Sequence, residues 1–139
     1  MAIIQASDLV KSYENPDDSS KYFNAVDGIS LSINRGEVYG ILGPNGAGKT
    51  TTLEMLEGLK DIDGGTAFIN SINVQDHPYQ VKQIIGVQLQ ANEYFDKMTL
   101  SELLNLFSAL YSLSNDPKEL LKKVNLEDKA NANANELSG

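Results

Sequence analysis

Gly43-Pro44-Asn45-Gly46-Ala47-Gly48-Lys49-Thr50 is the stretch that decides the fold of this 139-residue chain. It matches the phosphate-binding pattern G-x-x-x-x-G-K-[ST] at every fixed position. Its glycines allow the backbone to turn tightly and to point successive N–H groups at an anion. A short buried strand is expected before it, at residues 38–42, and a helix after it, at residues 49–58. Bound phosphates would then lie at the positive end of a helix dipole, so the segment predicts a nucleoside-triphosphate site.

Within this loop, each residue type suits a role in holding a triphosphate with its Mg²⁺. The backbone N–H groups of residues 43–51 would hold the phosphates, and the Lys49 ammonium would reach the β- and γ-phosphate oxygens. The Thr50 hydroxyl would bind the metal ion. A glycine-rich turn before an ordinary helix is the alternative interpretation. The predicted binding set is Gly43, Pro44, Asn45, Gly46, Ala47, Gly48, Lys49, Thr50 and Thr51, with Lys49 also predicted to be catalytic.

Composition restricts the class of protein. The hydrophobic content of 41% is enough for a core, and the length suits one domain. The net charge of −8 argues against a nucleic-acid surface, which needs a basic stripe. No apolar run approaches the roughly 18 residues of a membrane helix, no signal peptide is evident, and cysteine is absent. We therefore expect a soluble, cytoplasmic chain that binds no nucleic acid.

The apolar pattern also predicts strands separated by polar turns, and helices near the end of the chain. The strands expected at residues 23–33 and 38–42 are predicted to form a hairpin through the turn at residues 34–37. Thr99-Leu100-Ser101-Glu102 predicts a capping box that opens a helix to Leu113, and Asp116-Pro117 predicts the start of a second helix. His77, the single histidine, is expected on the surface. Strands are predicted at residues 3–13, 23–33, 38–42, 66–69 and 84–90.

Four motifs in order resemble the ATP-binding subunit or domain of ABC transporters. They are the phosphate loop, Ala25-Val26-Asp27-Gly28-Ile29-Ser30-Leu31 with Arg35-Gly36-Glu37-Val38, Ile85-Gly86-Val87-Gln88-Leu89-Gln90, and the terminal Glu136-Leu137-Ser138-Gly139. The last two are similar to the family's Q-loop and to the opening of its LSGGQ signature. The resemblance implies an α/β P-loop NTPase (ABC ATPase) with an antiparallel β subdomain, a partial RecA-like core and the start of a helical subdomain. It also implies that residues 1–139 are the amino-terminal part of one nucleotide-binding domain, truncated within the signature, with subdomains at about 1–90 and 91–139.

The resemblance implies roles for residues outside the loop. Tyr13 lies where the family places an aromatic that stacks on adenine, with a core tyrosine as the alternative. Because the link to the second strand is longer than usual, Tyr22 or Phe23 are possible substitutes. Gln90 would bind Mg²⁺ or hold the attacking water, as a catalytic and metal residue, with a surface glutamine as the alternative. Ser138 and Gly139 would contact the ATP held by a second subunit.

The implied function is MgATP binding and hydrolysis that powers export across a membrane. The implied partners are a second ATPase subunit, with nucleotide between the two, and a transmembrane permease subunit or domain that holds the chain at the membrane. The sequences at residues 55–59 and 85–90 are similar to those of the exporter branch of the family. The family's Walker B aspartate, catalytic glutamate and switch histidine have no match here. The alternative is therefore a nucleotide-binding or interaction module without hydrolysis; a GTPase would need an Asn-Lys-x-Asp motif, which the sequence lacks.

The resemblance also implies a core sheet in which further strands lie between the strands at residues 38–42 and 84–89, and these further strands have no match in this sequence. Unpaired strand N–H and C=O groups in a core each cost about 1–3 kcal/mol. The polypeptide alone is therefore expected to fold incompletely, to pair its edges with another copy, or to be part of a longer protein.

Overall fold

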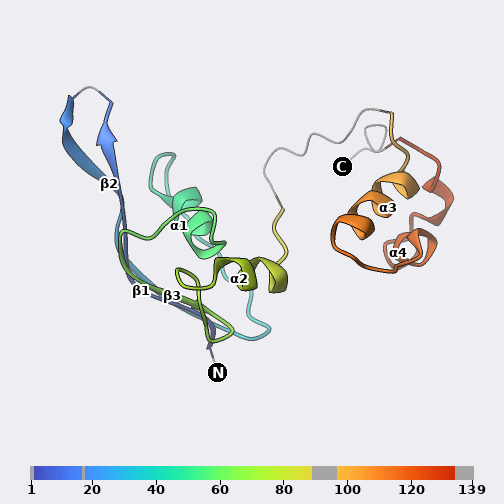
Figure 1. Cartoon of the computed structure of the whole chain (residues 1–139), viewed down its shortest axis with the longest axis horizontal. Helices are drawn as coiled ribbons and strands as arrows, with labels where there is room; N and C mark the ends of the chain where they lie inside the picture. The colour runs from blue at the N-terminus through green and yellow to red at the C-terminus, as the bar shows by residue number, and fades with distance from the viewer. Residues whose placement is uncertain (1, 17, 89–96, 134–139) are drawn as a thin grey trace. The chain divides into compact units, whose positions relative to one another are not determined.

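The computed structural model describes residues 2–16, 18–88 and 97–133. Its contacts divide the chain into two compact units, Met1–Gln88 and Leu89–Gly139 (Figure 1). The first unit combines an antiparallel sheet with two helices, and the second is helical where it is described. Within the described ranges, no helix is long and apolar enough to span a bilayer.

The first unit is built on a four-stranded antiparallel sheet in the order β2-β1-β3-β4. β1 (Ala2–Asn15) and β2 (Asp18–Asn34) form a long hairpin, which Figure 1 shows in blue. The other edge of β1 pairs with β3 (Gly64–Ile69), and β3 pairs with the short β4 (Ile72–Asn73). The strands predicted at residues 3–13, 23–33 and 66–69 are thus confirmed, each slightly longer than expected.

Helix α1 (Lys49–Leu56) packs its buried residues into the core of this unit. It ends two residues earlier than predicted, and Gly58 follows with a left-handed φ of 66°, which suits a helix terminus. Since the core holds α1, it also fixes the loop that precedes Lys49. The buried apolar cluster consists of Ala6, Leu9, Val26, Met55, Leu56, Ile62, Ala67, Ile69, Val74 and Val81.

The strand predicted at residues 38–42 is wrong. These residues adopt neither strand nor helix, and Val38 and Leu42 are 99% and 93% exposed. The predicted hairpin through residues 34–37 is also wrong, because residues 38–42 form no strand and β2 pairs with β1. A strand needs a neighbour for its N–H and C=O groups, and no segment in the described part of the chain pairs with residues 38–42.

The strand predicted at residues 84–90 is not formed over residues 84–88, and its last two residues lie outside the described part of the chain. Ile84 ends helix α2 (Pro78–Ile84), and residues 85–88 adopt no regular structure. Proline at the first position favours this helix, because a proline lacks the N–H that would be unpaired there. His77, the N-cap of α2, is exposed as predicted.

The second unit contains α3 (Leu100–Leu110), α4 (Pro117–Lys123) and the 3₁₀ helix η1 (Glu127–Lys129). The predicted capping box is confirmed: the Glu102 N–H donates to Thr99 Oγ1 at 3.3 Å, and the Thr99 N–H donates to Glu102 Oε2 at 2.8 Å. The Asp116 carboxylate caps α4 by accepting from the Lys118 N–H at 2.9 Å. The first of these helices ends three residues before the predicted Leu113.

Candidate functional site

The glycine-rich loop enters α1 through a left-handed backbone. Gly46 and Gly48 have φ of 82° and 79°, a region where a side chain strains the backbone. The Ala47 N–H donates to the Pro44 carbonyl at 3.3 Å and closes a turn. Gly48 is then the N-cap of α1, so this turn places the loop directly at the N-terminus of the helix.

The N-terminus of α1 suits an anion. The first turn carries no acidic side chain, and none of the described side chains caps it with a hydrogen bond. The first N–H groups of a helix have no partner within the helix, and together with the dipole they give this end a partial positive charge. An anionic group with several oxygens, such as a phosphate, matches both features.

Gly48 also attaches the loop to the sheet. A Cβ built on Gly48 would overlap the carbonyl oxygen of Ala25 and would lie 3.2 Å from Val26 Cγ2. Both residues belong to β2, which pairs with β1 along its length. The loop is thus held by backbone packing against the hairpin, and only glycine fits this position in both space and backbone conformation.

The Lys49 side chain folds back across the loop. Its Nζ donates to the carbonyl oxygens of Gly43 at 2.8 Å and Pro44 at 2.7 Å. These bonds hold the ammonium at the loop, where it can exchange two neutral acceptors for phosphate oxygens. Phosphate oxygens carry negative charge whereas the carbonyl oxygens are neutral, so the exchange pairs the ammonium with an opposite charge and favours a bound triphosphate.

The threonines that follow Lys49 divide between exposed and buried positions. Thr50 is exposed and Thr51 is half-buried, so both remain open to a ligand. Thr52 is fully buried, and its hydroxyl donates to the Gly48 carbonyl at 2.9 Å. The predicted role of Thr50 as a Mg²⁺ ligand therefore stays a prediction at an accessible position, whereas Thr52 has a role in the fold.

Tyr13 lies on β1 opposite Phe23 on β2, and the two rings form a pair. Their centroids are 6.1 Å apart and the rings are tilted by 36°. Phe23 is 47% exposed. Tyr22 pairs with Glu14 and, as a neighbour of Phe23 along the strand, lies on the opposite face of the hairpin. Of the three candidate aromatics, Tyr13 and Phe23 share one face.

The aromatic pair lies near the loop. Ala25, whose carbonyl contacts Gly48, follows Phe23 by two residues on β2. A strand rises about 3.3 Å per residue, so the two positions are about 7 Å apart along the strand. A nucleotide with its phosphates at the loop therefore has an aromatic surface within reach of its base.

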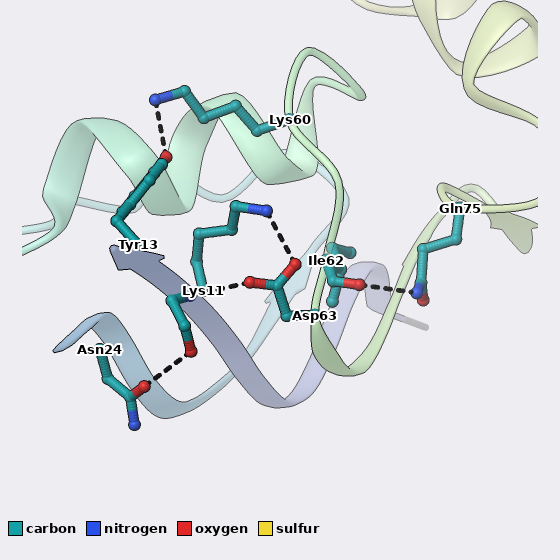
Figure 2. Close-up of polar contacts among 8 residues, drawn as sticks. Lys11, Tyr13, Asn24, Lys60, Ile62, Asp63 and Gln75 are labelled. Atoms are coloured by element: carbon teal, nitrogen blue, oxygen red, sulfur yellow. Dashed lines mark hydrogen bonds and ion pairs between the residues drawn. The ribbon is translucent and has the colours of Figure 1, made fainter. Parts of the chain in front are cut away.

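Asp63 ties the segment after α1 to β1. Its carboxylate accepts from Lys11 Nζ and from the Ser12 N–H, both at 2.8 Å, as Figure 2 shows for the lysine. The hydrogen bond from Lys11, followed by the one from Ser12, holds the pKa of Asp63 below its ordinary value of 3.8. Gln75 adds a bond from Nε2 to the Ile62 carbonyl at 3.3 Å.

The lowered pKa of Asp63 predicts a loss of stability in acid. The contribution is present above the unfolded pKa of about 3.8 and is lost as the pH falls through the lower folded value. We expect the melting temperature of Asp63→Asn to fall less than that of the wild type between pH 5 and pH 3. The difference should be a few degrees, because a solvent-screened pair contributes less than about 1 kcal/mol.

Thermal unfolding followed by circular dichroism at both pH values measures this effect. Asp61→Asn is the matched control, since it removes the same charge from an exposed neighbour in the same segment. Equal acid sensitivity in wild type and Asp63→Asn would contradict the prediction.

Three predicted site residues lie outside the part of the chain that the structure describes. They are Gln90, Ser138 and Gly139, and their predicted roles stay predictions. Among the described residues, no group of three or more histidine, cysteine or acidic side chains could hold a metal ion.

Sequence reasoning missed Lys60, whose Nζ donates to the Tyr13 hydroxyl at 2.9 Å, because no local pattern links positions 47 residues apart.

Comparison with known proteins adds to this geometry. The sequence model of a family described as ABC transporter matches residues 26–139. Nod factor export ATP-binding protein I of Burkholderia orbicola is 41% identical over 119 residues, which cover 82% of this chain and 39% of that protein. ABC transporter ATP-binding protein NatA of Bacillus subtilis is 38% identical over 120 residues, which cover 82% of this chain and 49% of that protein. The chain thus spans less than half the length of these two relatives.

A solved structure shows the same fold. It is described as the dimeric structure of a post-hydrolysis state of the ATP-binding cassette MJ0796 bound to ADP and Pi. It is 25% identical, superposes with a TM-score of 0.75, and matches 97% of this chain and 63% of its own. The predicted α/β P-loop fold with an antiparallel β part is confirmed by this likeness together with the observed sheet.

Proposed function

The chain belongs to the ABC transporter family, and from that premise we propose that it binds MgATP at residues 43–51 within an ATPase that powers export across a membrane. The observation that carries the proposal is the loop itself: a left-handed Gly48 packed on Ala25 opens α1, and Lys49 lies across the loop. These parts fit a triphosphate chemically, because they offer backbone N–H groups, a helix N-terminus and an ammonium group.

The proposed roles follow from these positions. Backbone N–H groups of residues 43–51 hold the phosphates, and Lys49 neutralises charge on the β- and γ-phosphates. The Thr50 hydroxyl and the Gln90 amide oxygen hold the Mg²⁺, which would neutralise charge that develops on the phosphates. The pair of Tyr13 and Phe23 provides the stacking surface for adenine.

The proposed assembly pairs this chain with a second ATPase subunit, with nucleotide between the two, and with a transmembrane permease subunit or domain. Its place is then cytoplasmic and peripheral to the membrane, and the charge of −8 fits a protein without a nucleic-acid partner. The dimer bound to ADP and Pi supports the pairing, and the export protein from Burkholderia supports the direction. The division at Gln88 and Leu89 supports subdomains at about 1–90 and 91–139.

Binding and phosphate release, measured on the same sample of the full-length protein, test the proposal. Calorimetric titration with MgATP should show saturable binding, and a phosphate assay should show release that depends on Mg²⁺. Binding without release would leave the second candidate, a nucleotide-binding or interaction module. Absence of MgATP binding would overturn both.

Tyr13→Ala is expected to weaken MgATP binding by about 2- to 12-fold, because an aromatic contact contributes about 0.5–1.5 kcal/mol beyond buried area. Binding of inorganic triphosphate with Mg²⁺ should stay unchanged, since this ligand has no base. Calorimetric titration with both ligands measures the difference. Tyr22→Ala, on the opposite face of the hairpin, is the control and should change neither affinity. Equal losses for both ligands would give Tyr13 a packing role instead.

A further inference from the structure

Lys60 connects the Tyr13 ring to helix α1. Lys60 follows the helix, and its Nζ donates to the Tyr13 hydroxyl at 2.9 Å, as Figure 2 shows. The same Nζ lies 3.1 Å from Glu54 Oε2, and the Lys60 N–H donates to the Glu54 carbonyl at 3.1 Å. Glu54 belongs to α1, the helix that begins at the phosphate loop. One lysine thus links the aromatic ring on β1 to the loop-bearing helix.

The geometry is that of a hydrogen bond at the hydroxyl end of the ring. Lys60 Nζ lies 5.2 Å from the ring centroid but only 2.9 Å from the hydroxyl oxygen. The hydrogen bonds to Tyr13 and then Glu54 raise the pKa of Lys60, so the donor stays charged at neutral pH. Lys11 also lies near the ring, at 5.7 Å from its centroid, but its ammonium pairs with Asp63 instead.

Two contacts, one from Phe23 and one from Lys60, hold the Tyr13 ring in place. Phe23 packs against the ring from β2, and Lys60 holds its hydroxyl from the end of α1. A swing of the Tyr13 side chain about its Cα–Cβ bond would carry the hydroxyl away and break the bond to Lys60. The ring and the phosphate loop therefore keep a set spacing, because both are attached to the same helix.

We propose that Lys60, held by Glu54, is a positioning residue that orients the Tyr13 ring toward the base of a nucleotide whose phosphates lie at the loop. The inference rests on the proposed function, because it needs a nucleotide in that loop. It goes further by making base binding depend on a hydroxyl and an ammonium that do not contact the nucleotide. Phenylalanine at position 13 would then stack less well than tyrosine, although the ring is the same.

A double-mutant cycle in the full-length protein tests the proposal. Lys60→Met keeps the stem and removes the ammonium, and Tyr13→Phe keeps the ring and removes the hydroxyl. Each should weaken MgATP binding by about threefold or more, without exceeding the loss in Tyr13→Ala, and the double variant should be no weaker than either single one, because both remove the same bond. Affinity for inorganic triphosphate with Mg²⁺ should stay within about twofold of the wild type.

Two further variants separate positioning from charge. Lys60→Arg keeps a charged donor on a long stem and should restore most of the MgATP affinity. Lys82→Met removes the same charge from an exposed position on α2 and should bind both ligands as the wild type does. Melting temperatures of all variants without ligand show that each is folded.

Three outcomes would overturn the inference while the wild type still binds MgATP. They are unchanged affinity in Lys60→Met, additive losses in the double variant, and an equal loss for inorganic triphosphate, which would show that Lys60 acts through its charge on the phosphates. A wild type that binds neither ligand would instead reject the proposed function itself.

Discussion

Lys49→Ala is expected to weaken MgATP binding by about 10- to 150-fold. The ammonium now bonds two loop carbonyls and would exchange them for phosphate oxygens. A hydrogen bond to a charged group contributes about 1.5–3 kcal/mol, and each 1.4 kcal/mol is a factor of ten in affinity. Alanine leaves that charge contact unmade. Calorimetric titration of the variant with MgATP measures the loss, and far-ultraviolet circular dichroism should show unchanged helical content.

The matched control for Lys49→Ala is Lys82→Ala, which removes the same charge from an exposed residue of α2. It should bind MgATP as the wild type does, because its contribution is screened by solvent. Lys49→Arg should recover only part of the affinity, since the donors of a planar guanidinium lie in a fixed fork and cannot reproduce the bonds of a compact ammonium. An ATP titration of Lys49→Ala that matches the wild type would remove the loop from the proposed function.

Local patterns could be predicted from the sequence because the residues that decide them are neighbours. The glycines of the loop, the capping box at Thr99 and the aspartate cap at Asp116 all act within a few positions of the chain. Each satisfies backbone groups or permits a backbone conformation without help from elsewhere. The loop, the start of α1 and the starts of α3 and α4 were therefore predictable.

Pairing between distant segments could not be predicted in the same way. Residues 38–42 are apolar enough for a strand, but a strand forms only beside another strand, and alternation of side chains does not name the partner. β2 finds its partner in β1, which is adjacent in sequence, and the two strands form a hairpin. The exposed Val38 and Leu42 show that apolar character alone did not give this segment a place in the sheet.

The supporting part of the site depends on contacts that no spacing reveals. Lys60 meets Tyr13 across 47 positions, and Lys11 meets Asp63 across 52. A lysine in a surface segment is usually a solvated charge, and nothing in its neighbours distinguishes one that holds an aromatic ring. The residues of the loop itself could be named from the sequence, whereas the residues that orient the base surface needed the folded chain.

Gly48→Ala is expected to destabilise the protein more than Gly46→Ala, although both glycines have a left-handed backbone. Their φ values, 79° and 82°, differ by little, so alanine adds similar strain of about 1–2 kcal/mol at each. A Cβ at Gly46 meets nothing within 4 Å, whereas a Cβ at Gly48 overlaps the Ala25 carbonyl. Overpacking of this kind costs a further 1–3 kcal/mol or so.

Thermal unfolding without ligand measures this comparison, with Gly46→Ala as the internal control for strain. A loss of 1 kcal/mol lowers the melting temperature of a domain the size of the unit Met1–Gln88 by roughly 4–8 °C, so Gly48→Ala should melt at least that much below Gly46→Ala. Relief of the overlap requires the start of α1 to move away from β2, and Gly48→Ala should therefore also lose MgATP binding. Equal melting temperatures for the two variants would show that the loop does not rest on Ala25, and the attachment of the phosphate site to the hairpin would have to be abandoned.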